Sequence, residues 1–201
     1  MPILEDAKKS LETLTGIARP TPDDLETKAV EPECYEFSDD GETPNNPRFP
    51  LLVYRHPALL SPKFDPAAVF EELFKRSGWQ ESWRDAIYPY NHFHTKTHEV
   101  LGIARGAASV RFGGANGKTI KIRAGDVIVI PAGTGHCAIF KSDDLLVVGA
   151  YPAGSDYDEP KPEEVDAGKA RASIAAVEAP ARDPVYGAGG PLRKLWRQHS
   201  A

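Results

Sequence analysis

Short apolar runs, separated by glycine-rich or charged turns, dominate the middle of the chain. This pattern predicts seven strands in about 65 residues, at 86–94, 98–105, 107–113, 118–123, 126–131, 136–141 and 145–151. Two more strands, at 34–37 and 51–54, flank the turn-rich sequence DDGETPNNPRFP. So many short strands predict an all-β domain built as a sandwich or barrel.

The helical patterns lie around this β-rich region. Residues 66–77 form the best predicted helix, because Asp65 can cap it, proline suits its first position and Gly78 can end it. Its apolar residues share one face, so we expect it to pack on the outside of the barrel. Shorter helical patterns cover 3–17 and 163–177.

The chain length is that of one ordinary domain with extensions. Its 201 residues, 41% of them hydrophobic, suffice for a single core. We expect an N-terminal extension over 1–30, a barrel over 31–152 with the helix near 66–77 inserted, and a C-terminal extension over 153–201. The last of these is polar and proline-rich up to an apolar stretch at 192–196, and we expect it to pack on the barrel.

Charge and cysteine content exclude several classes of partner. The net charge of −5 has no long run of one sign, which argues against nucleic acid. No segment approaches the roughly 18 apolar residues of a membrane span, and the start MPILEDAKKS lacks the apolar block of a signal peptide. Cys34 and Cys137 form no CxxC pair, so we expect reduced thiols in a cytoplasmic protein.

A histidine cluster is the main chemical signal. Three of the six histidines fall within seven residues, in the sequence NHFHTKTHEV. In a strand, His92 and His94 would point to the same side, as side chains two positions apart do. Antiparallel pairing would then bring either His98 or Glu99 beside them, and His136 could supply a fourth ligand.

The spacing of these residues resembles that of the cupin superfamily. His92-x-His94-x4-Glu99-x6-Gly106 resembles the first cupin motif, and Gly125-x5-Pro131-x-Gly133-x2-His136 resembles the second. The resemblance implies a jelly-roll barrel of six to eight strands. It also implies that one divalent metal ion is held by His92, His94, Glu99 and His136.

Other parts of the sequence resemble one group of cupins, and two positions depart from the usual cupin motifs. The sequences PNNPRFPLLVY, HEVLG and DPVYGAGGPLRKLW are similar to those of the YjlB-type single-domain cupins. Ala86 stands where the first motif usually opens with glycine, and Phe140 where the second usually ends in asparagine. Neither position is a ligand in the family, so the departures concern turns and packing.

Several neighbours of the cluster are candidates for catalysis. Tyr88 and Tyr90 share the parity of His92 and His94, so they either line the pocket or fill the barrel core. By alternation His98 should face away from Glu99, in a supporting role, although it becomes the substitute ligand if the register shifts by one. Tyr88, Tyr90 and His98 are the possible proton donors.

Three further residues lie next to these candidates in the sequence. Trp83 and Arg84 could close the pocket mouth and hold an anionic substrate, or Arg84 could be a surface cation. Cys137 should face away from His136, so we give it no catalytic role.

The ligand set leaves the chemistry open. Three imidazoles and a carboxylate can hold Fe, Mn, Ni, Zn or Cu. Iron or copper would suit dioxygenase chemistry on a small polar substrate, whereas zinc, manganese or nickel would suit isomerase or lyase chemistry. The alternatives are a non-catalytic cupin that binds or senses a small molecule or metal, and a metal-free epimerase-like barrel, against which four intact ligands argue.

The predicted sheet edges suggest a partner of the same kind. A barrel of this size leaves edge strands exposed, and the N-terminal strands could cover the edge of a neighbouring subunit. We therefore expect a homodimer.

Overall fold

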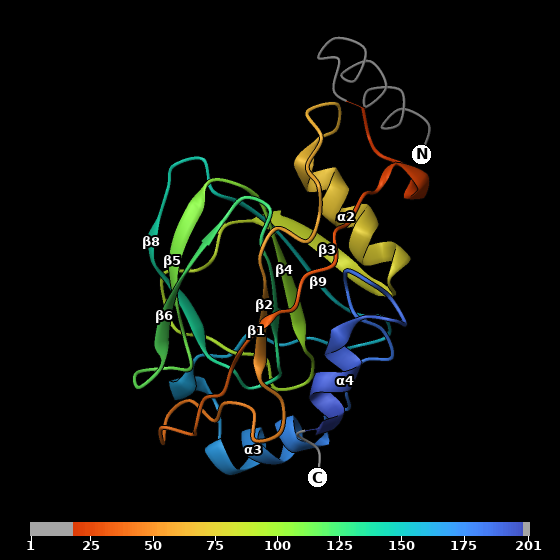
Figure 1. The fold of residues 1–201 in the computed structure, drawn as a ribbon. Helices are drawn as coiled ribbons and strands as arrows, with labels where there is room; N and C mark the ends of the chain where they lie inside the picture. Colours follow the sequence, from red (N-terminus) through yellow and green to blue (C-terminus); the bar gives the residue numbers. More distant parts are fainter. Residues whose placement is uncertain (1–17, 199–201) are drawn as a thin grey trace, which may run out of the picture.

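The computed structural model describes residues 18–198 and consists mainly of two antiparallel sheets (Figure 1). The helix expected over 3–17 lies outside the described residues. The larger sheet has the strand order β1-β2-β7-β4-β9-β3, and the smaller sheet has the order β6-β5-β8. The strands are β1 (Glu33–Tyr35), β2 (Leu51–Tyr54), β3 (Trp79–Asp85), β4 (Glu99–Arg105), β5 (Ala107–Phe112), β6 (Lys118–Arg123), β7 (Val127–Ile130), β8 (His136–Lys141) and β9 (Leu146–Pro152).

The larger sheet is buried on both faces. Along β4, Leu101 and Ile103 join the core between the two sheets, whereas Val100 and Ala104 join a second core on the opposite face. This alternation follows from the two-residue period of a strand. It explains why β2, β4 and β7 are almost continuously apolar instead of alternating between apolar and polar residues.

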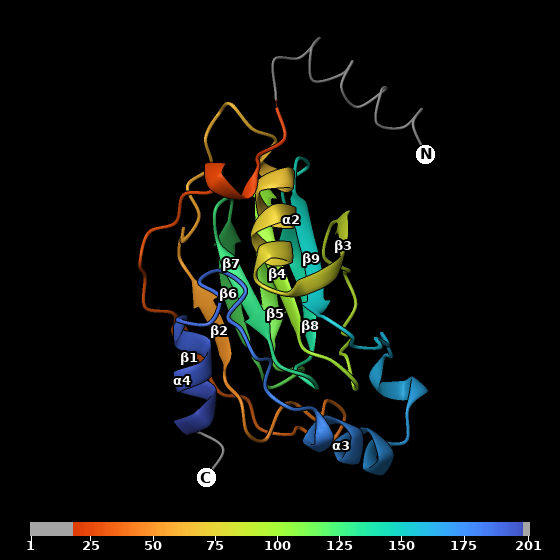
Figure 2. The ribbon, with the colours of Figure 1, turned by 90° about the vertical axis from the view of Figure 1, so that its right-hand side faces the viewer.

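Three helices of the described residues lie around the sheets, two against the larger sheet and one beyond the ends of the strands, as Figures 1 and 2 show. Helix α2 (Pro66–Arg76) begins at Asp65, whose side chain accepts a hydrogen bond from the Ala67 N–H, as its sequence predicts. It packs so closely on β4 that a Cβ at Gly102 would lie 2.5 Å from the Phe70 ring. Helix α3 (Ala167–Ala176) and helix α4 (Pro191–Gln198) belong to the C-terminal extension.

One predicted strand is wrong. Residues 86–94 are not a regular strand: the chain forms β3 at 79–85 and then runs irregularly to residue 98, with His92 only in an isolated bridge to His136. Pro89 explains the interruption, because proline has no N–H for a strand ladder. Strand β3 escaped prediction because its sequence, WQESWRD, is largely polar and lies at a sheet edge.

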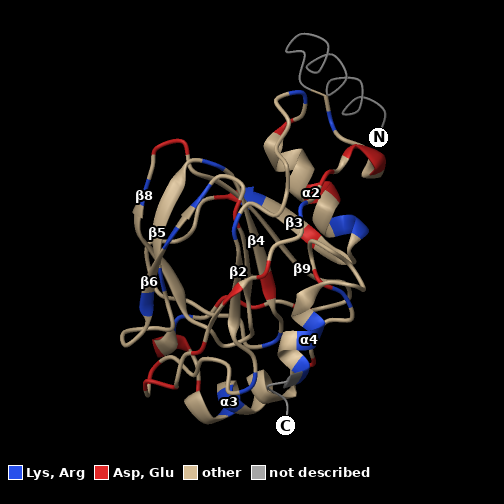
Figure 3. Cartoon of the chain, viewed as in Figure 1, with Lys and Arg blue, Asp and Glu red and all other residues tan. Residues whose placement is uncertain are grey.

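Two sequence-based expectations about the surface can be compared with the described residues. Lys and Arg are interspersed with Asp and Glu on the loops, helices and outer strands, as Figure 3 shows. Within residues 18–198, no helix combines the length and the apolar composition needed to cross a bilayer.

Candidate metal centre

Three histidines meet at one end of the space between the sheets. His136 is the first residue of β8, and its backbone pairs with that of His92 through two hydrogen bonds of 2.9 and 3.3 Å. His94 is fixed in the same way, since its carbonyl accepts a hydrogen bond from the Gly133 N–H at 2.7 Å. One ring nitrogen from each of His92, His94 and His136 lies within 4.8 Å of the others, and all three residues are buried.

Glu99 is the fourth member of this cluster. It opens β4 on the side that faces the smaller sheet, and its Oε2 atom lies 3.3 Å from His94 Nε2 and 3.4 Å from His136 Nε2. The structure therefore brings Glu99, and not His98, beside the three imidazoles. We call His92, His94, Glu99 and His136 the four-residue cluster.

Backbone carbonyls orient all three imidazole rings. The Nδ1 atoms of His92, His94 and His136 face the carbonyl oxygens of Tyr90, Asp158 and Thr134, respectively. A carbonyl can only accept a hydrogen bond, so in the neutral ring the proton belongs on Nδ1 and the lone pair on Nε2. The cluster therefore presents imidazole lone pairs toward one point, which is what metal coordination needs.

Two buried polar atoms in the cluster have no hydrogen-bond partner. These are His94 Nε2 and Glu99 Oε2, which lie opposite each other. Leaving such groups unpartnered costs free energy, roughly 1–3 kcal/mol each and more for a charged group. A cation held between them would satisfy both atoms, so the donor set fits a divalent metal ion.

The electrostatics of the cluster favour a charged carboxylate. Burial opposes ionisation of Glu99, yet His94 and His136 outweigh it and lower the pKa of Glu99 below its ordinary value. Burial likewise opposes protonation of His94, but Glu99 raises the pKa of His94 on balance. Burial, reinforced by His136, lowers the pKa of His92 to about 3, so this imidazole is neutral at physiological pH.

His98 lies on the opposite face of the sheet from the cluster. Its Nδ1 accepts a hydrogen bond from the Ala132 N–H at 2.9 Å, and its Nε2 donates to the Glu178 carbonyl at 3.2 Å. Its ring packs against Phe49 and Trp196. Both nitrogens are thus engaged with the backbone, and His98 does not line the cavity beside the cluster.

Acid should destabilise the metal-free protein through His98. Burial lowers the pKa of His98 from 6.5 to about 3. Between these values the unfolded state binds more protons, so stability is lost as the pH falls below 6.5. At pH ~4.5 the loss from this residue should be about 3 kcal/mol, at roughly 1.4 kcal/mol per pH unit.

The measurement is urea unfolding of the chelator-treated protein at neutral and acid pH. The comparison is His98→Asn, because asparagine keeps an acceptor near the position of Nδ1 but does not titrate. The variant should start less stable and lose about 3 kcal/mol less than the wild-type protein over this interval. Parallel losses would contradict the buried neutral state of His98.

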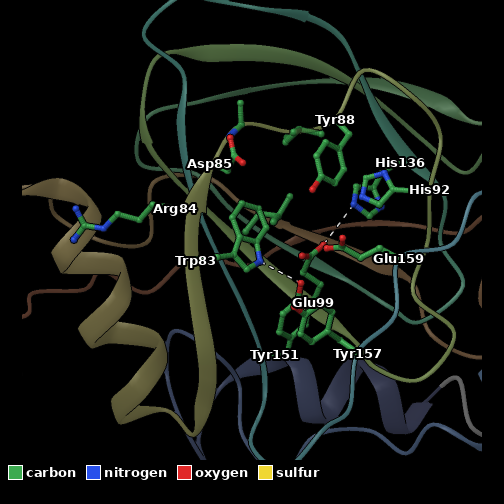
Figure 4. Close-up of a pocket in the computed structure, with 13 residues that line it drawn as sticks. Trp83, Arg84, Asp85, Tyr88, His92, Glu99, His136, Tyr151, Tyr157 and Glu159 are labelled. Carbon is green, nitrogen blue, oxygen red and sulfur yellow. Dashed lines mark hydrogen bonds and ion pairs between the residues drawn. The ribbon is translucent and has the colours of Figure 1, made fainter.

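A cavity of about 240 Å³ opens beside the cluster (Figure 4). His92, Glu99 and His136 line its inner end, and Trp83, Tyr88, Tyr151, Tyr157 and Glu159 line its walls. Tyr88 and Tyr90 stack on each other with centroids 4.9 Å apart and are 37% and 41% exposed, so neither fills the barrel core. Only Tyr88 reaches the cavity lining.

Arg84 behaves as a surface cation. Its side chain points away from the cavity toward α2, as Figure 4 shows, and is paired with Glu71 at 2.6 Å and Asp65 at 2.7 Å. The alternative, in which Arg84 holds an anionic substrate, does not agree with this geometry.

The C-terminal extension supplies site residues that sequence reasoning missed. The Asp158 carboxylate accepts hydrogen bonds from the backbone N–H and the hydroxyl of Thr95, at 2.8 and 2.6 Å, and the Asp158 carbonyl faces His94. Tyr157 and Glu159, which precede and follow Asp158 in the sequence, line the cavity. Their contacts join positions about 60 residues apart in the sequence, and no local pattern signals such pairing.

The fold and the cluster together define a class of protein. Two facing antiparallel sheets bring the histidines and the acid of the first motif to the histidine of the second, which is the arrangement of a single-domain cupin. The chain is 39% identical over 166 residues to the uncharacterized protein YjlB of Bacillus subtilis (strain 168), covering 83% of this chain and 97% of that protein. The chain belongs to the family of YjlB-type cupins.

Other comparisons add little. No family model matches the chain. Acireductone dioxygenase from Bacillus anthracis, with a cadmium ion in its active center, is 18% identical with a TM-score of 0.34, over 49% of this chain and 68% of that one. An oxalate decarboxylase variant from Bacillus subtilis is 19% identical with a TM-score of 0.36, over 56% and 27%. Procruciferin, an 11S globulin from Brassica napus, is 14% identical with a TM-score of 0.33, over 48% and 29%.

Proposed function

We propose that this protein binds one divalent metal ion through His92, His94, Glu99 and His136 and is a metal-dependent enzyme acting on a small polar molecule. One observation carries the proposal. The buried His94 Nε2 and Glu99 Oε2 atoms face each other without hydrogen-bond partners, within a cluster whose imidazole lone pairs converge. Unsatisfied buried groups of this kind call for a missing partner, and a cation is the partner that suits both atoms.

The donor set allows several metals. Imidazole and carboxylate ligands suit Fe, Mn, Ni, Zn and Cu, and their order of affinity does not select among them. When bound, such an ion would supply either a site for O2 or a Lewis acid that polarises an oxygen of the substrate.

The surrounding residues define what the chain itself contributes. The Tyr88 hydroxyl reaches the cavity, and its pKa is raised, mainly by the nearby Glu159 carboxylate, so the phenol keeps its proton at neutral pH. Tyr88 can therefore donate a hydrogen bond or a proton to a bound molecule.

Elemental analysis of protein purified without added metal or an affinity tag tests the proposal. We expect about one metal ion per chain, lost in His92→Ala because one of the converging imidazoles is removed. His56→Asn is the matched control, since His56 lies outside the cluster, paired with Asp126. Asparagine also tolerates the positive backbone φ of 52° at position 56.

The identity of the metal directs the next assays. Iron or copper would direct the search to O2-dependent turnover, whereas zinc, nickel or manganese would direct it to isomerase and lyase reactions. Metal without turnover on a broad panel would favour the non-catalytic alternative, a metal-binding or sensing cupin. Absence of metal in the wild-type protein, even after reconstitution, would contradict the four-residue site.

A further inference from the structure

Aromatic rings form much of the cavity wall. Trp83 comes from β3, Tyr88 from the segment after it, Tyr151 from β9 and Tyr157 from the C-terminal extension, and Figure 4 shows the four around the cavity. Tyr151 and Tyr157 are stacked with centroids 4.9 Å apart, and Trp83 Nε1 donates a hydrogen bond to the Tyr151 hydroxyl at 3.1 Å. Grouped rings held in this way attract cations through their π faces.

The charged groups of the cavity are mainly acidic. Asp85 and Glu159 line it together with Glu99, and the lining residue with a positive charge, Arg84, is already paired with Asp65 and Glu71. Within residues 18–198 the Glu159 carboxylate has no hydrogen-bond or ion-pair partner. Even with a divalent ion in the cluster, Asp85, Glu99 and Glu159 together leave the lining with an excess of negative charge.

An ammonium group already lies on an aromatic ring next to the cavity lining. Lys161 Nζ lies 5.0 Å from the centroid of Tyr90, which stacks on the lining residue Tyr88. Lys161 itself is outside the cavity lining and lies 3.6 Å from Glu164. Lys161 therefore does not occupy the cavity, and Tyr157 and Glu159 at its wall are exposed to a cation from solution.

We propose that the cavity binds a small organic ammonium ion that also carries an oxygen donor. The ammonium group would lie among the rings and beside Glu159, and the oxygen would face the four-residue cluster. The role of the oxygen rests on the proposed function, whereas recognition of the cation depends only on the rings and carboxylates. The lining itself offers a small carboxylic acid no free cationic side chain.

Two probes of the same shape test the charge preference. Choline and 3,3-dimethylbutan-1-ol both carry a hydroxyl group and differ in a charged nitrogen against a neutral carbon. Trp83 fluorescence reports binding, since the other two tryptophans, Trp79 and Trp196, are 1% and 0% exposed. We expect choline to bind at least about fivefold more tightly than the neutral alcohol, in metal-free and in zinc-loaded protein.

Substitution of Glu159 tests the contribution of its carboxylate. Glu159→Gln should weaken choline binding at least about threefold and leave the binding of the neutral alcohol unchanged, because only the charged probe interacts with the carboxylate. Glu163→Gln, an exposed acid in the same extension and outside the cavity lining, should change neither.

Equal affinities for the two probes, tighter binding of the neutral alcohol, or no binding of choline at millimolar concentrations would overturn the inference. A parallel zinc titration separates this result from the proposed function. Zinc binding with equal probe affinities would overturn only the ammonium preference. A preference for choline in a protein that binds no zinc would support cation recognition and overturn the metal site.

Discussion

Replacing Glu99 by glutamine should weaken zinc binding by at least about 100-fold. Changes to residues that merely orient metal ligands weaken binding by about 10- to 100-fold, and Glu99 is placed to contact the ion directly. It is the only anionic member of the cluster, so the amide would leave three neutral imidazoles to hold a doubly charged ion. Competition with a chromophoric zinc chelator measures the two affinities.

The variant should still fold, because glutamine has nearly the volume of glutamate. Circular dichroism of the metal-free proteins checks this point. Glu163→Gln removes an exposed carboxylate and should bind zinc as the wild-type protein does. Unchanged zinc affinity in a folded Glu99→Gln variant would remove Glu99 from the ligand set and leave a site of three histidines.

Replacing Asp183 by alanine should lower the free energy of unfolding by about 3–5 kcal/mol. Asp183 is 0% exposed. Its carboxylate accepts hydrogen bonds from the Tyr54 hydroxyl at 2.6 Å and from the backbone N–H groups of Val185, Tyr186 and Leu192 at 2.8, 3.0 and 3.2 Å. Alanine would leave all of these buried donors without a partner, which costs much more than an exposed substitution.

Urea unfolding at neutral pH measures this loss. Asp143→Ala, at an exposed turn between β8 and β9, should change the free energy of unfolding by less than about 0.5 kcal/mol. The loss in Asp183→Ala also tests how the C-terminal extension is attached, since the carboxylate joins β2 to the segment before α4. A loss below about 1 kcal/mol would mean that these hydrogen bonds are replaced by water.

For His92 and His94, the prediction from motif spacing and the prediction from strand geometry have different results. Their shared orientation was expected from a regular strand over 86–94, and that strand does not exist. They converge because His92 pairs with the backbone of His136 and His94 is held by Gly133. The motif spacing thus indicated residues that do lie together in the structure, while the strand argument misjudged the backbone that positions them.

The prediction from side-chain alternation agrees with the structure at β4, where a regular strand forms. His98 and Glu99 were expected on opposite faces, and in β4 and the residue before it they are, with Glu99 toward the imidazoles and His98 toward Phe49 and Trp196. Alternation is a property of the extended backbone itself, so it holds without knowledge of the neighbouring strands.

The sequence by itself determined the all-β class, the start of α2 at Asp65 and the residues of the four-residue cluster, because periodicity, capping and motif spacing are local properties of the chain. Only the tertiary structure decided which groups surround the cluster. It directed Arg84 to α2 and brought Asp158 and Glu159 to the site from the C-terminal extension. Such contacts join distant segments through packing and hydrogen bonds, which leave no periodic trace in the sequence.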